Sequence, residues 1–141
     1  MRKRLVFREL LTADVFDLVG KGQWPAGAWS VLEESGFTRA GRAQGEEGVL
    51  DWGDALALLR VAGRQGMPLP LAESLVASWV LDRVGLAYPG GPLTLAIADA
   101  TVTVTQNASG TEISGTVTNV PWAENVTQVV MVWAEEGGPE P

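Results

Sequence analysis

The stretch "MPLPLAESLVASWVLDRVGL", Met67 to Leu86, decides the fold class of this chain. Pro68 and Pro70 predict a helix start, because proline is tolerated before a helix and in its first turn but not in its interior. Apolar residues then cover most of the helix circumference: Leu71, Leu75, Val76, Trp79, Val80, Leu81 and Val84. A helix that is apolar on so many sides must lie among other elements. We therefore expect a central helix with Trp79 in the core.

The sequence before this stretch predicts three more helices. Residues 5–19 place apolar side chains at spacings of three and four, which is typical of an amphipathic helix. A short helix over residues 25–36 starts at a proline and ends at a glycine. The glycine-rich residues 38–48 read as a surface loop. Asp51 is a suitable N-cap for a helix that runs to about Gly63, in which we expect three apolar residues to be buried: Leu56, Leu59 and Val61.

Beyond Gly90-Gly91 the sequence becomes rich in Val, Thr and Ile, which favours strands, and "NASG" predicts a turn between two of them. Helices first and strands second indicate an α+β fold, with an amino-terminal helical domain and a small antiparallel β-sheet fragment. We divide the chain into a helical domain (1–87), a partial β-domain (88–135) and a disordered acidic tail (136–141). Residues 93–134 should form the sheet, with four of its apolar positions at Ile113, Val117, Val129 and Met131.

Composition excludes several classes of function. The 141 residues include no Cys and no His, which removes thiolate nucleophiles, disulfides and every triad or dyad with an imidazole base. A net charge of -7 argues against a nucleic-acid partner. No apolar run approaches the ~20 residues that span a bilayer. Arg8 and Glu9 interrupt the apolar segment that resembles a signal peptide, so we expect a cytoplasmic protein without a membrane partner.

The acidic residues offer no convincing catalytic or metal site. Glu46 and Glu47 lie among loop glycines, and we expect them to be solvated, together with Asp51. Glu73 lies near the start of the most apolar helix, where a carboxylate favours the helix dipole. The serines have no His partner, so a hydrolase is excluded. The sequence therefore predicts no catalytic residue and no metal ligand.

Four segments, taken in order, resemble the acyl-CoA dehydrogenase family. They are "W..VLEESGFTRA", "GDALALLRVAGRQGMPLPLAESLVASWVLDRVGL", "GPLTLA" and "ISGTVTNVPWAENVTQVVMV". Together they cover nearly the whole chain and are similar to the helical amino-terminal domain and the start of the middle β-domain. The chain departs from the family pattern in three places, because it lacks the Gly-Gly pair of the loop and the Thr-Glu-Pro and Gly-Ser-Asp signatures.

The resemblance implies a chemistry and a cofactor. Family members remove two hydrogens from the α and β carbons of an acyl-CoA thioester, using a carboxylate base and FAD. It implies that Val120, Pro121 and Trp122 lie near the flavin, with Gly115 at a turn. An ordinary role for Trp122, covering the core at the end of a strand, remains open. The family base usually belongs to a carboxy-terminal helical domain, for which these residues contain no counterpart.

Three functional hypotheses follow. The first is a truncated or divergent acyl-CoA dehydrogenase-like chain of fatty acid or lipid metabolism that is inactive alone. The second is a non-catalytic partner subunit or interaction module of a flavoenzyme complex, and the third is a structural protein without a ligand. Because a β-fragment exposes strand edges, we expect a homodimer or a heteromeric complex, held partly through Trp122, Val129, Met131 and Trp133.

Overall fold

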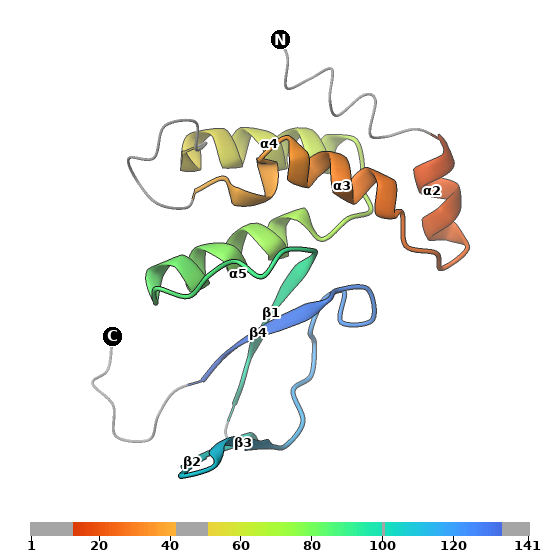
Figure 1. Cartoon of the computed structure of the whole chain (residues 1–141). Coiled ribbons are helices and arrows are strands. Elements are labelled where there is room, and N and C mark those ends of the chain that lie inside the picture. Colours follow the sequence, from red (N-terminus) through yellow and green to blue (C-terminus); the bar gives the residue numbers. More distant parts are fainter. Residues whose placement is uncertain (1–12, 42–50, 100, 134–141) are drawn as a thin grey trace.

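The computed structural model describes residues 13–41, 51–99 and 101–133 (Figure 1). Its helical elements come first and its strands second, which confirms the α+β class. The helices are α2 (Ala13–Gly20), α3 (Ala26–Glu34), the 3-10 helix η1 (Phe37–Arg39), α4 (Trp52–Arg64) and α5 (Leu71–Arg83). The strands are β1 (Leu93–Ile97), β2 (Thr103–Asn107), β3 (Gly110–Ser114) and β4 (Gln128–Val132).

Local signals fix the helix ends as the sequence predicts. Asp51 caps α4, because its side chain accepts a 2.8 Å hydrogen bond from the Asp54 N–H. Gly36 follows α3 with φ 78°, a left-handed conformation that suits glycine after a helix. Pro70 directly precedes α5. Of the predicted helix over residues 5–19, the structure describes the part from residue 13 onward; the earlier part lies outside the described residues.

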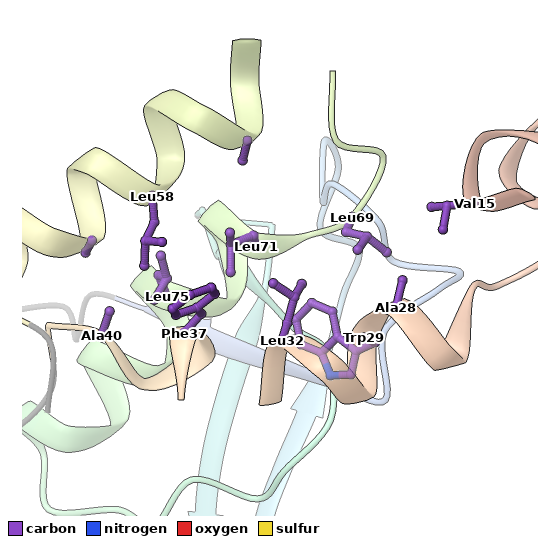
Figure 2. Close-up of a cluster of buried hydrophobic side chains, with 12 residues drawn as sticks. Val15, Ala28, Trp29, Leu32, Phe37, Ala40, Leu58, Leu69, Leu71 and Leu75 are labelled. Carbon is purple, nitrogen blue, oxygen red and sulfur yellow. The ribbon is translucent and has the colours of Figure 1, made fainter. Parts of the chain in front are cut away.

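The hydrophobic core lies between the helices. Figure 2 shows its side chains converging from α3, η1, α4 and α5, with Val15 of α2 beside Ala28 and Leu69 at one end. The cluster consists of Val15, Ala28, Trp29, Leu32, Phe37, Ala40, Ala55, Leu58, Ala62, Leu69, Leu71 and Leu75. Its largest fully buried members are leucines, so the helices bury a continuous apolar centre.

The buried face of α4 differs from the prediction. Leu56 is 58% exposed, and Leu59 and Val61 are only partly buried against the core. The residues that face inward are Ala55, Leu58 and Ala62, spaced three and four apart. Two alanines on this face let the helix backbone approach its neighbours closely, and Leu56 turns toward the outside.

The central helix α5 also turns a different face inward. Trp79 is 37% exposed, and Val76 and Val84 are exposed as well, so the prediction of a core Trp79 is wrong. The buried residues of α5 are Leu71, Ser74, Leu75, Ala77 and Ser78. Small side chains allow α5 to pack closely against η1 and β1. The Trp79 ring instead contacts the Trp52 ring edge-to-face, with the two ring centroids 6.1 Å apart.

The strands form two separate pairs. β2 and β3 pair antiparallel through the predicted "NASG" turn, in which the Ser109 N–H and hydroxyl donate to Asn107 Oδ1 at 3.0 and 2.6 Å. β1 and β4 pair in parallel, from Leu93 opposite Gln128 to Ile97 opposite Val132. The expectation of an antiparallel fragment is therefore correct for the hairpin and wrong for β1 and β4. About 30 residues separate these two strands, enough for the crossover that a parallel pair requires.

The segment after β3 is not a strand, although "TVTNV" has strand composition. Gly115 has φ 136°, and a Cβ there would collide with the backbone of Thr101 and Val102. This close approach ends β3, and residues 115–127 run as turns and irregular chain to β4. The hairpin lies away from the helices at the far end of the β part (Figure 1).

Helix α5 packs against β1 across the boundary that we placed between residues 87 and 88. The division into domains stays a prediction, and the acidic tail (136–141) lies outside the described residues. No helix in the described ranges is long and apolar enough to cross a membrane.

Candidate functional site

The segment that the resemblance assigns to a flavin is a turn with an unusual backbone. Val120 and Trp122 are half-buried and Pro121 is exposed. Asn119 and Trp122 have φ values of 57° and 58°. Asn tolerates the left-handed region, whereas a bulky residue such as Trp adopts it at a cost of about 1–3 kcal/mol. The Trp122 conformation is therefore held by its surroundings.

Hydrogen bonds hold this turn in place. The Trp122 carbonyl accepts from the Asn125 N–H at 2.8 Å and from the Val126 N–H at 3.2 Å. Thr127 then donates both its N–H and its hydroxyl to the Pro92 carbonyl, at 3.0 and 3.1 Å. The turn is thereby anchored beside the first residue of β1. Val120, Pro121 and Trp122 lie together as neighbours in one chain segment, with Trp122 at the start of the anchored turn.

A second set of contacts ties the same end of the sheet to α3. The Glu33 carboxylate accepts a 2.7 Å hydrogen bond from the Gly91 N–H, and the Tyr88 hydroxyl lies 3.1 Å from Glu33 Oε1 and 2.7 Å from the Gly91 carbonyl. Gly91 has φ 76°, and a Cβ there would meet Thr127 Oγ1 at 2.7 Å. The segment 88–92 therefore links the helices to the turn that carries Trp122.

The residues around Trp122 can be compared with what the two halves of FAD require. Trp122 and Val120 supply apolar surface of the kind that contacts an aromatic ring system. The diphosphate needs cations or a cluster of backbone N–H groups, and residues 84–141 contain no Lys or Arg. The same residues contain six acids, Asp99, Glu112, Glu124, Glu135, Glu136 and Glu140. The β part therefore offers apolar surface to a ring system but no cation to a diphosphate.

Local structure accounts for the positions of Glu73, Asp51 and Asp99. Glu73 lies in the first turn of α5, as predicted from its sequence position, but it is half-buried there rather than exposed. Asp51 is used as a helix cap. Asp99 is exposed, and hydrogen bonds from the Thr101 hydroxyl (2.6 Å) and N–H (2.9 Å) hold the pKa of its carboxyl below the ordinary value. Glu46 and Glu47 lie outside the described residues. In the described ranges, no three His, Cys, Asp or Glu side chains gather as a metal site.

Sequence reasoning missed the buried hydroxyl groups that join α5 to its neighbours. Ser74 Oγ accepts from the Leu93 N–H and donates to the Leu93 carbonyl, both at 2.9 Å. Ser78 Oγ lies 3.0 Å from the Leu75 carbonyl and 3.4 Å from the Thr38 carbonyl. The signal was present in the sequence, because a serine every four residues on an apolar helix marks one polar stripe.

Comparisons with protein-family models, with curated proteins and with solved structures gave no match. The resemblance to acyl-CoA dehydrogenases thus rests on the sequence segments quoted above.

Proposed function

We propose that this chain is a subunit of a flavin-dependent acyl-CoA dehydrogenase-like enzyme, located in the cytoplasm, and that it is inactive without a partner. In such an enzyme FAD, when bound, would supply the acceptor for the hydride of the acyl-CoA β carbon. This chain would contribute a helical wall and the apolar turn around Trp122. The order of the resembling segments along the chain and the order of helices before strands support the proposal.

The positive φ of the half-buried Trp122 is the observation that supports the proposal most strongly. Strained backbone is found preferentially at ligand sites, where surrounding structure over-determines it. Here the strained residue is a half-buried tryptophan, in the segment that the resemblance places beside the flavin. A fixed backbone at Trp122 reduces the conformational freedom that is lost when this residue packs on a ring, which favours binding.

Two features of the chain support the need for a partner: the β part has no Lys or Arg, and the described acids include no clear candidate for the base. The β part has no cation that could pair with the FAD diphosphate, and in this proposal a second polypeptide, rather than the Lys and Arg residues of the helical part, supplies it. Glu73 is the least implausible base among the described acids, but it lies in the first turn of α5, a position that its role at the helix N-terminus explains. We therefore expect the isolated chain to be unable to dehydrogenate acyl-CoA.

Flavin binding is tested by titrating FAD and, separately, riboflavin into the purified chain while flavin absorbance and fluorescence are followed. We expect weak binding of both, with a similar affinity, because only the ring is contacted. Trp122→Leu should weaken binding about tenfold, since stacking on an aromatic side chain is worth about 1–3 kcal/mol. Trp79→Leu, which removes a partly exposed indole from α5, is the matched control and should bind like the parent. Equal binding by the parent and Trp122→Leu would contradict the proposal.

Turnover is tested with acyl-CoA, FAD and an artificial electron acceptor, on the parent and on Glu73→Gln. No turnover by either protein is the expected result. Clear turnover by the parent would refute the requirement for a partner, and its loss in Glu73→Gln would identify Glu73 as the base.

The non-catalytic interaction module is a second candidate, favoured by the exposed apolar side chains of the β part. Ile97 is 73% exposed, and Val129, Val132 and Trp133 are exposed as well. Such surface is typical of an interface. An interaction module should associate with a partner without binding flavin. A chain that forms a complex but leaves the flavin spectrum unchanged would therefore favour this second candidate.

A further inference from the structure

The two outer edges of the β1 and β4 pair differ in whether their backbone groups have hydrogen-bond partners. In a strand, the N–H and C=O of one residue point to one edge, and successive residues alternate between edges. The Ala98 N–H donates to the Val132 carbonyl at 2.9 Å, so Val132, and with it Val130, points its backbone groups toward β1. Val129 and Met131 therefore point theirs to the outer edge of β4.

The outer edge of β1 is closed by α5. Leu93 turns its N–H and carbonyl away from β4, and the Ser74 hydroxyl bonds both of them at 2.9 Å. Leu93 and Ser74 are fully buried. No such contact covers β4, which has no strand on its outer side in the described part of the chain. Val129 is 47% exposed, so β4 presents unpaired backbone groups together with apolar side chains.

Charge indicates what can pair with this edge. β4 carries no charged residue, but Glu124 precedes it and Asp99 follows β1, so acids lie near both ends of the pair. All ten Lys and Arg residues belong to residues 1–83. Pairing with the β4 strand of a second copy would bring two acidic β parts together without a compensating cation. A strand with basic ends would meet complementary charge instead.

We propose that the outer edge of β4 receives an extended segment of another polypeptide, with Lys or Arg at its ends, as an added strand. Backbone hydrogen bonds to Val129 and Met131 supply affinity, and the acids supply specificity. This inference rests on the proposed function in one respect, because both require a second polypeptide. Strand docking is measured without flavin, so its failure and the failure of flavin binding by Trp122 are distinguishable.

The experiment uses two fluorescent probe peptides with the same alternating Val-Thr core and either Lys or Glu at both ends. We expect the Lys probe to bind about tenfold tighter than the Glu probe at low salt, and the difference to shrink as ionic strength is raised to about 0.5 M, where surface charges are screened. Val129→Pro removes one outer N–H without removing a bond to β1, and should abolish binding. Ile113→Pro, on the exposed strand β3, is the matched control and should leave binding unchanged.

Amide hydrogen exchange of the parent protein gives a measurement that needs no variant. The amides of Val129 and Met131 should exchange fast in the free chain and become protected when the Lys probe is added, while those of Val130 and Val132 should be slow throughout. Binding of neither probe, equal binding of both, or unchanged binding by Val129→Pro would overturn the inference. Protection of Val129 and Met131 before any probe is added, together with a dimer in sedimentation, would assign the edge to a second copy instead.

Discussion

The helical part of this chain buries many apolar side chains, whereas the β part buries few. Of the buried apolar residues in the described ranges, only Leu93 and Ala96 belong to the β part, and both lie on the strand that packs against α5. The helices surround their own core, whereas β2, β3 and β4 leave almost every side chain at least partly exposed. The helical part therefore supplies most of the folding free energy, and the β part supplies surface.

The comparison is tested most strongly by Leu75→Ala. Leu75 is fully buried beside Leu58 and Phe37 in the cluster in Figure 2, so we expect a loss of about 2–5 kcal/mol in the free energy of unfolding. Chemical denaturation followed by circular dichroism measures it. Leu56→Ala, on the exposed side of α4, is the control and should change the free energy by less than about 0.5 kcal/mol. Similar losses for the two variants would show that the core does not lie where we place it.

The link between the two parts is tested by Ser74→Ala. This change leaves the buried N–H and carbonyl of Leu93 without their hydrogen-bond partner, which should lower the free energy of unfolding by about 1–3 kcal/mol. Ser30→Ala is the control, because the Ser30 hydroxyl bonds the Ala26 carbonyl on an exposed helix surface. The measurement is thermal or chemical denaturation of both variants. If Ser74→Ala matched Ser30→Ala in stability, β1 would not depend on α5.

What the sequence could predict was local. Asp51, Gly36 and Pro70 act within one turn of themselves, and the helix ends that they predict are those of the structure. The buried faces of α4 and α5 depend on partners distant in the chain. Ser74 and Ser78 mark a polar stripe on α5 in the sequence, but no local pattern identifies Leu93 as the partner of the Ser74 hydroxyl.

The same limit applies to the sheet and the site. The parallel pairing of β1 with β4 joins segments about 30 residues apart, so strand composition alone could not choose it over an antiparallel pair. Trp122 was selected through a family resemblance. Its positive φ could not be predicted, because that conformation is expected of Gly or Asn and is imposed here by the anchored turn.

Trp79→Ala tests how much the partly exposed side of α5 contributes to the stability of the helical part. The sequence predicted a core residue, whose removal would cost ~3–5 kcal/mol. In the structure Trp79 is partly exposed and contacts the Trp52 ring from the outside of α5. We therefore expect a loss of only about 1 kcal/mol, close to the value of one aromatic pair. Thermal denaturation measures it, and Trp52→Ala in the same background should add little. A loss as large as that of Leu75→Ala would restore the original prediction.

The smallest effect is expected at Asp99, where the β part turns between β1 and β2. Hydrogen bonds from the Thr101 hydroxyl and N–H favour the charged carboxylate, so the pKa of Asp99 lies below its ordinary value in the folded chain. The stability that these bonds contribute is fully present above the unfolded pKa of about 3.9, and it is lost as the pH falls through the lower folded value.

Thr101→Val removes the hydroxyl and keeps the N–H. NMR titration of Asp99 should therefore show its pKa moving up toward the ordinary value in Thr101→Val, and Thr105→Val, in the middle of β2, should leave it in place. Because Asp99 is exposed, overall stability near neutral pH should barely change. An Asp99 pKa that is the same in the parent and in Thr101→Val would mean that the Thr101 hydroxyl does not stabilise the Asp99 carboxylate.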